Sequence, residues 1–267
     1  MNAAQMAITD GVTIARRNAI KIKRNPDLLG FVVMQPIMFV LLFSYIFGSA
    51  IDIPGMSYRE FMLPGIFAQT AIFGAILTGY GLALDLQKGI IDRFRTLPMS
   101  PSAVLIGRTA SDVFSNVVSL IAMVLVGLIV GWRIHTPPQD ALLGFLVLLL
   151  FAYACSWLMA VIALAIRTPE VYNNAASIVV FPLTFIANTF VDSGRLPGPL
   201  KVAAEWNPVS AVTQAARELF GNTNPAMPVP EAWPLQHPVA ASLLWAALML
   251  AVFIPLATRL YKKAVSR

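Results

Sequence analysis

The stretch that decides the fold runs from residue 141 to residue 166 and reads ALLGFLVLLLFAYACSWLMAVIALAI. It contains no Asp, Glu, Lys, Arg or His. A helix needs about 20 apolar residues to cross the hydrocarbon core of a bilayer, and this run is longer. A membrane β-barrel would show short segments of alternating polarity instead. The stretch therefore predicts a transmembrane helix.

The rest of the chain has the same apolar character. Of its 267 residues, 58% are hydrophobic and only 12% are charged, and the mean hydropathy is +0.73. A soluble domain normally carries about 25% charged residues. We predict an all-α polytopic membrane protein whose six spans form one domain over residues 1–267. The predicted transmembrane helices are residues 28–49, 61–84, 113–131, 141–166, 171–190 and 239–258.

The basic residues predict the orientation of these helices. If the N-terminus is cytoplasmic, 14 of the 19 Lys and Arg residues fall on the cytoplasmic side, as the positive-inside rule expects. An even number of spans then returns the C-terminus to the same side. The net charge of +6 is thus explained by topology, without nucleic-acid binding. We expect a multi-pass protein of the bacterial plasma (inner) membrane with both termini cytoplasmic.

The first 27 residues are basic and carry apolar residues at helical spacing, such as Ile8, Val12 and Ala15. This pattern is typical of an amphipathic helix that lies along the membrane surface. We predict such an interface helix on the cytoplasmic side. The alternative is a solvated basic tail.

The sequence lacks the motifs of several enzyme classes. It contains no G-x-x-x-x-G-K-[ST], no H-E-x-x-H and no G-x-S-x-G. With one cysteine and two histidines we expect no metal site, no catalytic residue and no cofactor in this chain. The predicted spans have no ionisable residue in their interiors, and Asp85 and Asp112 are expected at span ends, in the interface. The energy for any transport would therefore come from outside the membrane domain.

The predicted cytoplasmic loop, residues 85–112, contains the sequence KGIIDRFRTLPMS at residues 88–100. Gly89 can end the helix of the second span. Residues 90–97 suit a short amphipathic helix stopped by Pro98, with Phe94 as an aromatic anchor for a groove on a soluble partner. The alternative is a helix that rests on lipid headgroups.

The segment from Lys88 to Arg108 resembles the signature of ABC type-2 export permeases, most closely the membrane subunits of daunorubicin and doxorubicin resistance exporters. In that family it forms the coupling helix that docks into the ATPase subunit. Gln87-Lys88 differs from the family pattern, in which an acidic residue often precedes the glycine. The docking residues that the resemblance implies are Lys88, Gly89, Asp92, Arg93, Phe94, Arg95, Pro98 and Met99.

A second match lies in residues 191–238, before the last span. The sequences LPGPL at 196–200 and NPVSAV at 207–212 resemble the family's outer hairpin, whose short helices re-enter the outer leaflet. The resemblance implies that Pro197, Asn207 and Pro208 belong to this outer gate.

The resemblance also implies partners and a function. It implies two permease subunits, identical or paralogous, and two ATP-binding subunits that hold ATP and Mg²⁺, all within membrane lipid. The expected function is outward movement of an amphipathic drug or lipid-like molecule. Export of cell-envelope lipid or polysaccharide is an alternative, and a membrane assembly protein without transport is a second. We expect the substrate path to include Phe39, Phe43, Phe67, Gln69, Phe73, Asn173 and Asn174, although the polar members suit contacts between helices equally well.

Overall fold

The computed structural model describes residues 34, 37–48, 53, 55–89, 101–166, 168–224, 226 and 230–265. The predicted interface helix, residues 1–27, lies outside this part of the chain. So does most of the predicted coupling helix, including Asp92, Arg93, Phe94, Arg95, Pro98 and Met99.

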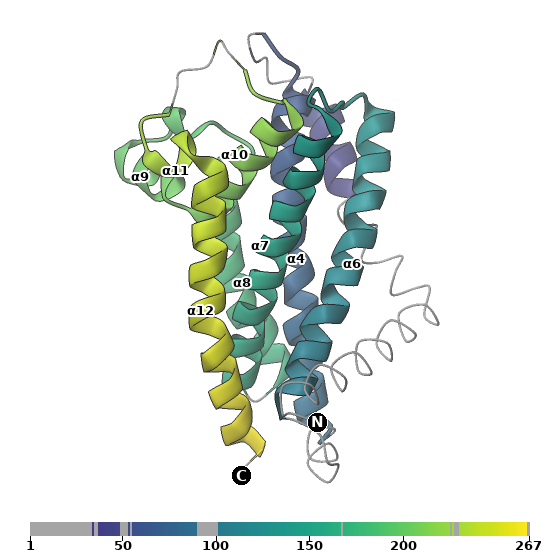
Figure 1. Cartoon of the computed structure of the whole chain (residues 1–267), viewed down its shortest axis with the longest axis vertical. Coiled ribbons are helices and arrows are strands. Elements are labelled where there is room, and N and C mark those ends of the chain that lie inside the picture. The colour runs from purple at the N-terminus through teal and green to yellow at the C-terminus, as the bar shows by residue number, and fades with distance from the viewer. Residues whose placement is uncertain are drawn as a thin grey trace.

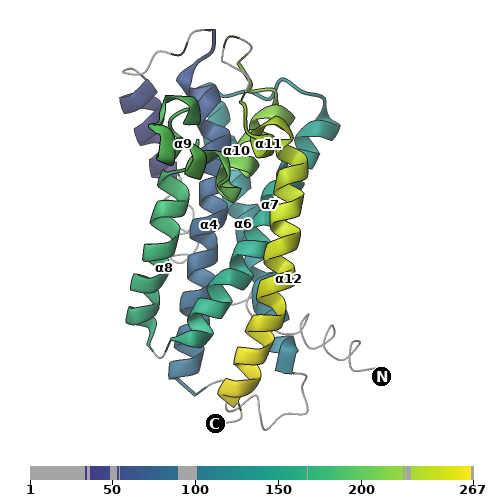
Figure 2. The same cartoon turned by 90° about the vertical axis from the view of Figure 1, so that its left-hand side faces the viewer.

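Long helices lie side by side in one bundle (Figures 1 and 2). The described residues form helices and turns, apart from one isolated β-bridge between Ile53 and Met56. The central helix, α4, packs against α6, α7, α8 and α10. The bundle helices are α4 (Tyr58–Gln87), α6 (Pro101–Val130), α7 (Pro138–Ala165), α8 (Pro169–Phe185) and α12 (Pro238–Val265).

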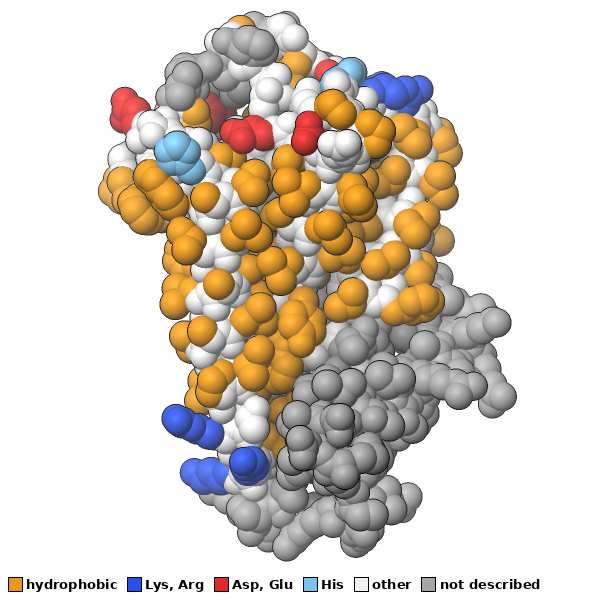
Figure 3. Space-filling view, in the orientation of Figure 1, with side chains coloured by type: hydrophobic (Ala, Val, Ile, Leu, Met, Phe, Trp, Pro, Cys, Tyr) orange, Lys and Arg blue, Asp and Glu red, His pale blue; other side chains and the backbone are white. Residues whose placement is uncertain are grey.

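Four described helices are long and apolar enough to cross a membrane. Figure 3 shows apolar side chains over the middle of the bundle, with Lys and Arg side chains at the C-terminal end of α12 and acidic side chains near the other end. The prediction of a multi-pass all-helical membrane protein is confirmed. The spanning helices are Tyr58–Gln87, Gly107–Val130, Pro138–Ala165 and Pro238–Lys263.

The other two predicted spans are only partly matched by helices. α8 has 17 residues, so it is about 26 Å long at a rise of 1.5 Å per residue. This is shorter than the roughly 30 Å of the hydrocarbon core. The described part of the first predicted span is the helix Ile37–Phe47, in which Phe43–Phe47 is a π-helical turn, η1. The count of six spans therefore stays a prediction.

The connection between α4 and α6 is shorter than predicted. α6 begins at Pro101, so residues 101–112 are helical and do not belong to a loop. Hydropathy placed the span boundary at Val113 because Arg108 and Asp112 interrupt the apolar run, although charged residues do not end a helix. α4 ends as predicted: Gly89 has a φ of 63°, and its N–H donates to the carbonyl of Leu86.

Small residues on α4 let its neighbours approach closely. A Cβ atom at Gly79 would overlap the ring and hydroxyl of Tyr172 from α8, and one at Gly81 would overlap the guanidinium of Arg108 from α6. The Tyr172 hydroxyl donates to the Ile76 carbonyl on the same stretch of α4, at 2.9 Å. The side chains of Tyr172 and Arg108 thereby lie directly on the α4 backbone. These contacts fix the spacing of α4, α6 and α8.

Short helices gather at one end of the bundle, and we call residues 186–236 the cap (Figure 1). Within the cap, α10 packs against α4, α7 and α12. The position of the cap relative to the bilayer stays a prediction. Its elements are η2 (Ser193–Arg195), α9 (Gly198–Glu205), α10 (Pro208–Phe220) and α11 (Trp233–Gln236).

Candidate functional site

Seven phenylalanine rings follow one another along the edge of the bundle, and we call them the aromatic ladder. Neighbouring rings have centroids 4.4 to 6.3 Å apart, a spacing typical of favourable aromatic pairs. The ladder joins the helix Ile37–Phe47 to α8 and to α4. In order of contact its members are Phe47, Phe43 with Phe39, Phe190, Phe185, Phe181 and Phe73.

Part of the aromatic ladder lies at the surface of the subunit. Phe181 and Phe185 are 50% and 51% exposed, although both belong to the apolar helix α8. Figure 2 shows α8 at the edge of the bundle, with the purple helix of residues 37–47 beside its cap-side end. The ladder therefore forms an aromatic surface on one side of the chain.

Exposed amide groups continue this surface along α8. Asn173 and Asn174 are exposed near the start of α8, and Asn174 lies on the same helical face as Phe181 and Phe185. An amide that faces lipid hydrocarbon without a partner costs several kcal/mol. This face of α8 is therefore better suited to water, a polar ligand or another protein chain than to lipid.

The structure places two of the predicted path residues elsewhere. Phe67 is fully buried in a second aromatic cluster, where its ring meets Trp132 and Phe220 edge to face at 5.2 and 6.2 Å. Gln69 is also buried, and its amide has no hydrogen-bond partner among the described residues. The structure thus brings together Phe39, Phe43 and Phe73 but separates them from Phe67.

The predicted gate residues begin the cap helices. Pro197 and Asn207 precede α9 and α10 as N-cap residues, and Pro208 is the first residue of α10. The Asn207 side chain accepts a hydrogen bond from the Val209 N–H at 2.8 Å and donates one to the Leu183 carbonyl at 2.7 Å. Asn207 therefore caps α10 and also attaches the cap to the end of α8, close to the aromatic ladder.

Arg217 is a second attachment, which the sequence did not predict. Its side chain is buried and donates to the carbonyls of Phe61 at 2.8 Å and Asn188 at 2.7 Å. The guanidinium lies 3.7 Å from the centre of the Phe61 ring. Burial lowers the pKa of Arg217 to about 9, so the group stays charged at neutral pH. α10 is thereby joined to the start of α4 and to the turn that carries Phe190.

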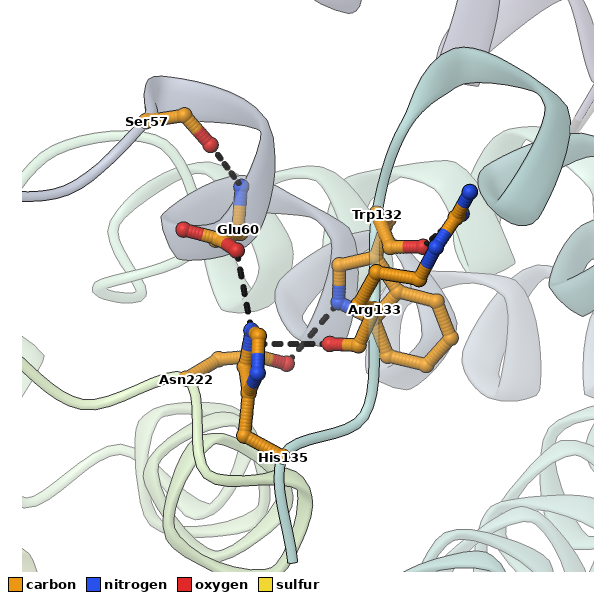
Figure 4. Close-up of polar contacts among 6 residues, drawn as sticks. All are labelled: Ser57, Glu60, Trp132, Arg133, His135 and Asn222. Atoms are coloured by element: carbon orange, nitrogen blue, oxygen red, sulfur yellow. Dashed lines mark hydrogen bonds and ion pairs between the residues drawn. The ribbon is translucent and has the colours of Figure 1, made fainter.

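A third set of contacts closes the cap on the other side of α10 (Figure 4). The Trp132 Nε1–H donates to Asn222 Oδ1 at 2.8 Å, and Asn222 Nδ2 donates to the Arg133 carbonyl at 3.0 Å. His135 Nε2 lies 3.0 Å from Glu60 Oε1. The end of α10 is therefore held against the α6–α7 connection, which itself contacts the start of α4.

The opposite end of the bundle carries a group of charges beside the predicted coupling segment. Arg108 Nη1 on α6 lies 3.3 Å from Asp85 Oδ2 on α4, and Lys88 is exposed just beyond. Asp112 lies in the second turn of the spanning helix Gly107–Val130, and its Oδ2 atom is buried. Asp112 thus lies near one end of its span, and the expectation that the interiors of the spans hold no ionisable residue stays a prediction.

Known proteins support the assignment of this architecture to a transporter. Residues 10–220 match the family model of the ABC-2 type transporter. The chain is 34% identical to the daunorubicin resistance ABC transporter permease protein DrrB1 of Streptomyces coeruleorubidus, over 97% of this chain and 88% of that relative.

Two further relatives are more distant. The ycf38 protein of Porphyra purpurea, whose name describes a transport permease, is 25% identical over 79% of this chain and 74% of its own. The doxorubicin resistance ABC transporter permease protein DrrB of Mycobacterium tuberculosis is 27% identical over 39% of this chain and 36% of its own. The family match and the DrrB1 similarity together cover the bundle, the aromatic ladder and most of the cap, and the chain therefore belongs to the ABC-2 type transporter family of membrane permeases.

Proposed function

We propose that this chain is the membrane subunit of an ATP-driven exporter that moves an amphipathic drug or lipid-like molecule outward. ATP and Mg²⁺ would bind to a separate subunit, since permeases of this family work with an ATP-binding partner. The observation that carries the proposal is the surface formed by the aromatic ladder and the exposed amides of α8. It offers aromatic rings and hydrogen-bonding groups to one molecule that has both apolar and polar parts.

The path runs along this surface, between the chain and a second permease subunit. The surface begins at Asn173 and Asn174 at one end of α8 and reaches Phe190 in the cap. A substrate that moves along α8 therefore meets polar groups first and aromatic rings afterwards. The largely apolar ladder favours an amphipathic or lipid-like substrate over a polysaccharide, whose hydroxyl groups would need many hydrogen-bonding partners.

The cap closes the outer end of the path. Asn207 attaches the cap to the end of α8, and Arg217 attaches it to the start of α4. ATP-dependent motion of the coupling segment, residues 88–100, would shift α4 and α6 together because the Arg108–Asp85 pair joins them. The motion would reach the cap through α4. ATP binding can shift the subunit from one conformation to another only if the contacts between α4 and the cap differ in the two conformations.

The test is transport by the reconstituted complex of this chain and its ATP-binding subunit. Daunorubicin is a suitable probe because the relative DrrB1 is named for resistance to it. An aromatic contact contributes about 0.5–1.5 kcal/mol, so the double variant Phe181→Ala, Phe185→Ala should raise the KM for the probe about tenfold.

The matched control is Phe114→Ala. Phe114 is 51% exposed, like Phe185, but lies on α6 outside the aromatic ladder. Its loss should leave the KM unchanged. An equal rise in KM for Phe114→Ala and for the double variant, or no rise for the double variant, would show that the ladder does not contact the substrate.

A further inference from the structure

Three of the five tryptophans in the chain line one groove between the cap and α12. Trp206 follows α9, Trp233 begins α11, and Trp245 lies on α12. The groove is open on one side and has a volume of about 170 Å³, and all its lining residues are apolar or aromatic. The remaining lining residues are Pro234, Ala241, Leu244 and Leu248.

The groove is continuous with an apolar stripe that runs down α12. Leu244, Leu248, Val252 and Leu256 recur every four residues and are all exposed, so they lie on one face of the helix. α12 is one of the spanning helices and runs along the length of the bundle (Figure 1). An extended hydrocarbon chain that lies along this stripe therefore has its outer end in the groove.

The volume of the groove indicates which kind of molecule it can bind. Sites for drug-sized molecules enclose roughly 300–1,000 Å³, well above the 170 Å³ of this groove. An apolar cavity of about 150 Å³ holds a group of the size of benzene. The groove therefore holds a short length of alkyl chain more fully than it holds a fused polycyclic molecule.

Charged groups lie next to the groove on the cap. Lys201 Nζ is 3.8 Å from Glu205 Oε1 and 3.6 Å from Glu231 Oε2. Glu205 directly precedes Trp206, and Glu231 lies two residues before Trp233. Tryptophan rings beside charged residues, at the end of an apolar stripe, are typical of the level where lipid headgroups meet hydrocarbon.

We propose that this groove binds one acyl chain of a phospholipid from the leaflet on the cap side of the membrane. The apolar end of the groove holds the chain between Trp245 and Leu248, and the headgroup lies at the level of Lys201 and Glu231. A bound chain would contact Trp206 at the end of α9 and would support α11, which packs on α12. The proposal depends on the spanning bundle and not on export. A result that contradicts the export function would therefore not contradict this lipid site.

The experiment is photo-crosslinking of the full chain in vesicles of phosphatidylcholine and phosphatidylethanolamine. A small fraction of the phosphatidylcholine carries a diazirine in the middle of one acyl chain, and labelled peptides are mapped by mass spectrometry. Labelling of the groove residues should saturate as the probe fraction rises. Labelling of Ile121, Leu125 and Ile129, which are exposed on α6, should rise in proportion to the probe because ordinary surrounding lipid does not saturate.

A pair of variants tests the groove directly. Ala241→Leu fills the groove, because Ala241 is a buried lining residue, and should lower groove labelling several-fold. Ala240→Leu makes the same change at an exposed neighbour outside the groove and should not alter it. The saturation series on the unmodified chain gives an answer even if Ala241→Leu fails to fold. Groove labelling that rises in proportion to the probe, or is absent, would overturn the proposal, since the groove would then hold only exchanging lipid or be covered by protein.

Discussion

Individual residues of this permease act mainly through the backbone atoms that they contact. Asn207 donates to the Leu183 carbonyl in the last turn of α8, where helices leave carbonyls without internal partners. Arg217 donates to the Asn188 carbonyl in the turn that follows α8. Gly79 works in the opposite way, because its missing side chain leaves room for Tyr172 on the α4 backbone.

The variant Gly79→Ala should destabilise the protein. Alanine is normally favoured over glycine in a helix by about 1 kcal/mol, but a Cβ at residue 79 overlaps the Tyr172 ring. Displacing that ring also breaks its hydrogen bond to Ile76. We expect the free energy of unfolding to fall by about 1–3 kcal/mol, measured as a lower midpoint of thermal unfolding in detergent micelles.

Gly198→Ala is the control for this change. Gly198 lies at the start of α9, and nothing lies within 4 Å of the position of an added Cβ. Its midpoint should stay the same or rise slightly. A Gly79→Ala protein as stable as the Gly198→Ala protein would contradict the close packing of α8 on α4.

The sequence predicted some of these residues and missed others for a physical reason. Gly89 has a local signature, a glycine after an apolar run, and it does end α4. Phe39, Phe43 and Phe73 were expected in a path, and they do lie in one ladder. Phe67 lies outside the ladder. A single sequence does not show which face of an apolar helix packs against which neighbour, so this position could not be predicted. Arg217 was missed as a contact because its acceptors are backbone carbonyls, which leave no signal in the residue types.

At the scale of elements, the two helices that flank the predicted coupling segment are joined to each other. α4 and α6 are joined near the ends that lie away from the cap by Asp85 and Arg108, with Arg108 lying over Gly81. The sequence predicted α4 to within three residues but began the third span twelve residues late. Hydropathy reports where a helix is apolar, whereas this helix extends past its apolar part.

Phe94→Ala should uncouple the complex while leaving the bundle intact. Phe94 lies in the segment between α4 and α6 and is the aromatic residue of the predicted coupling helix. Loss of an interface hot spot costs about 2 kcal/mol or more, which corresponds to a Kd for the ATP-binding subunit that is roughly 30-fold weaker. Binding to the chain in lipid nanodiscs and substrate-stimulated ATP hydrolysis measure the effect.

Phe114→Ala serves again as the control, since it removes a half-exposed phenylalanine from α6 itself. It should leave both binding and hydrolysis unchanged. If Phe94→Ala and changes at Arg93 and Arg95 all leave both quantities intact, the segment rests on the membrane surface and does not transmit motion.

At the scale of the whole molecule, the cap and the C-terminal end of α12 lie at opposite ends of an apolar bundle (Figure 3). The class of fold could be predicted from the length of the apolar runs. A continuous apolar run of this length satisfies its backbone hydrogen bonds in lipid by forming a helix. The cap could not be predicted in the same way, since its helices are short and are held by contacts between residues far apart in the sequence.

This arrangement allows a test of the predicted orientation. Single cysteines at positions 194 and 263, introduced after Cys155→Ser, lie in the cap and in the last turn of α12. In intact cells a membrane-impermeant maleimide should label position 194 and not position 263, because the basic residues predict a cytoplasmic C-terminus. The reverse pattern would overturn both the orientation and the assignment of the coupling segment.

The most direct test of the account asks whether the aromatic ladder faces a path or faces lipid. The changes Phe181→Cys and Phe114→Cys are made singly in the Cys155→Ser chain, at two positions that are 50% and 51% exposed in the subunit. The rate of labelling by a water-soluble thiol reagent is measured on the complex with its ATP-binding subunit, first without nucleotide and then with ATP and vanadate. We predict that the thiol at position 181 is labelled and that its rate changes several-fold on nucleotide trapping, while the thiol at position 114 stays unlabelled in both states. Equal, nucleotide-independent labelling at the two positions would contradict the claim that this surface is the route of export.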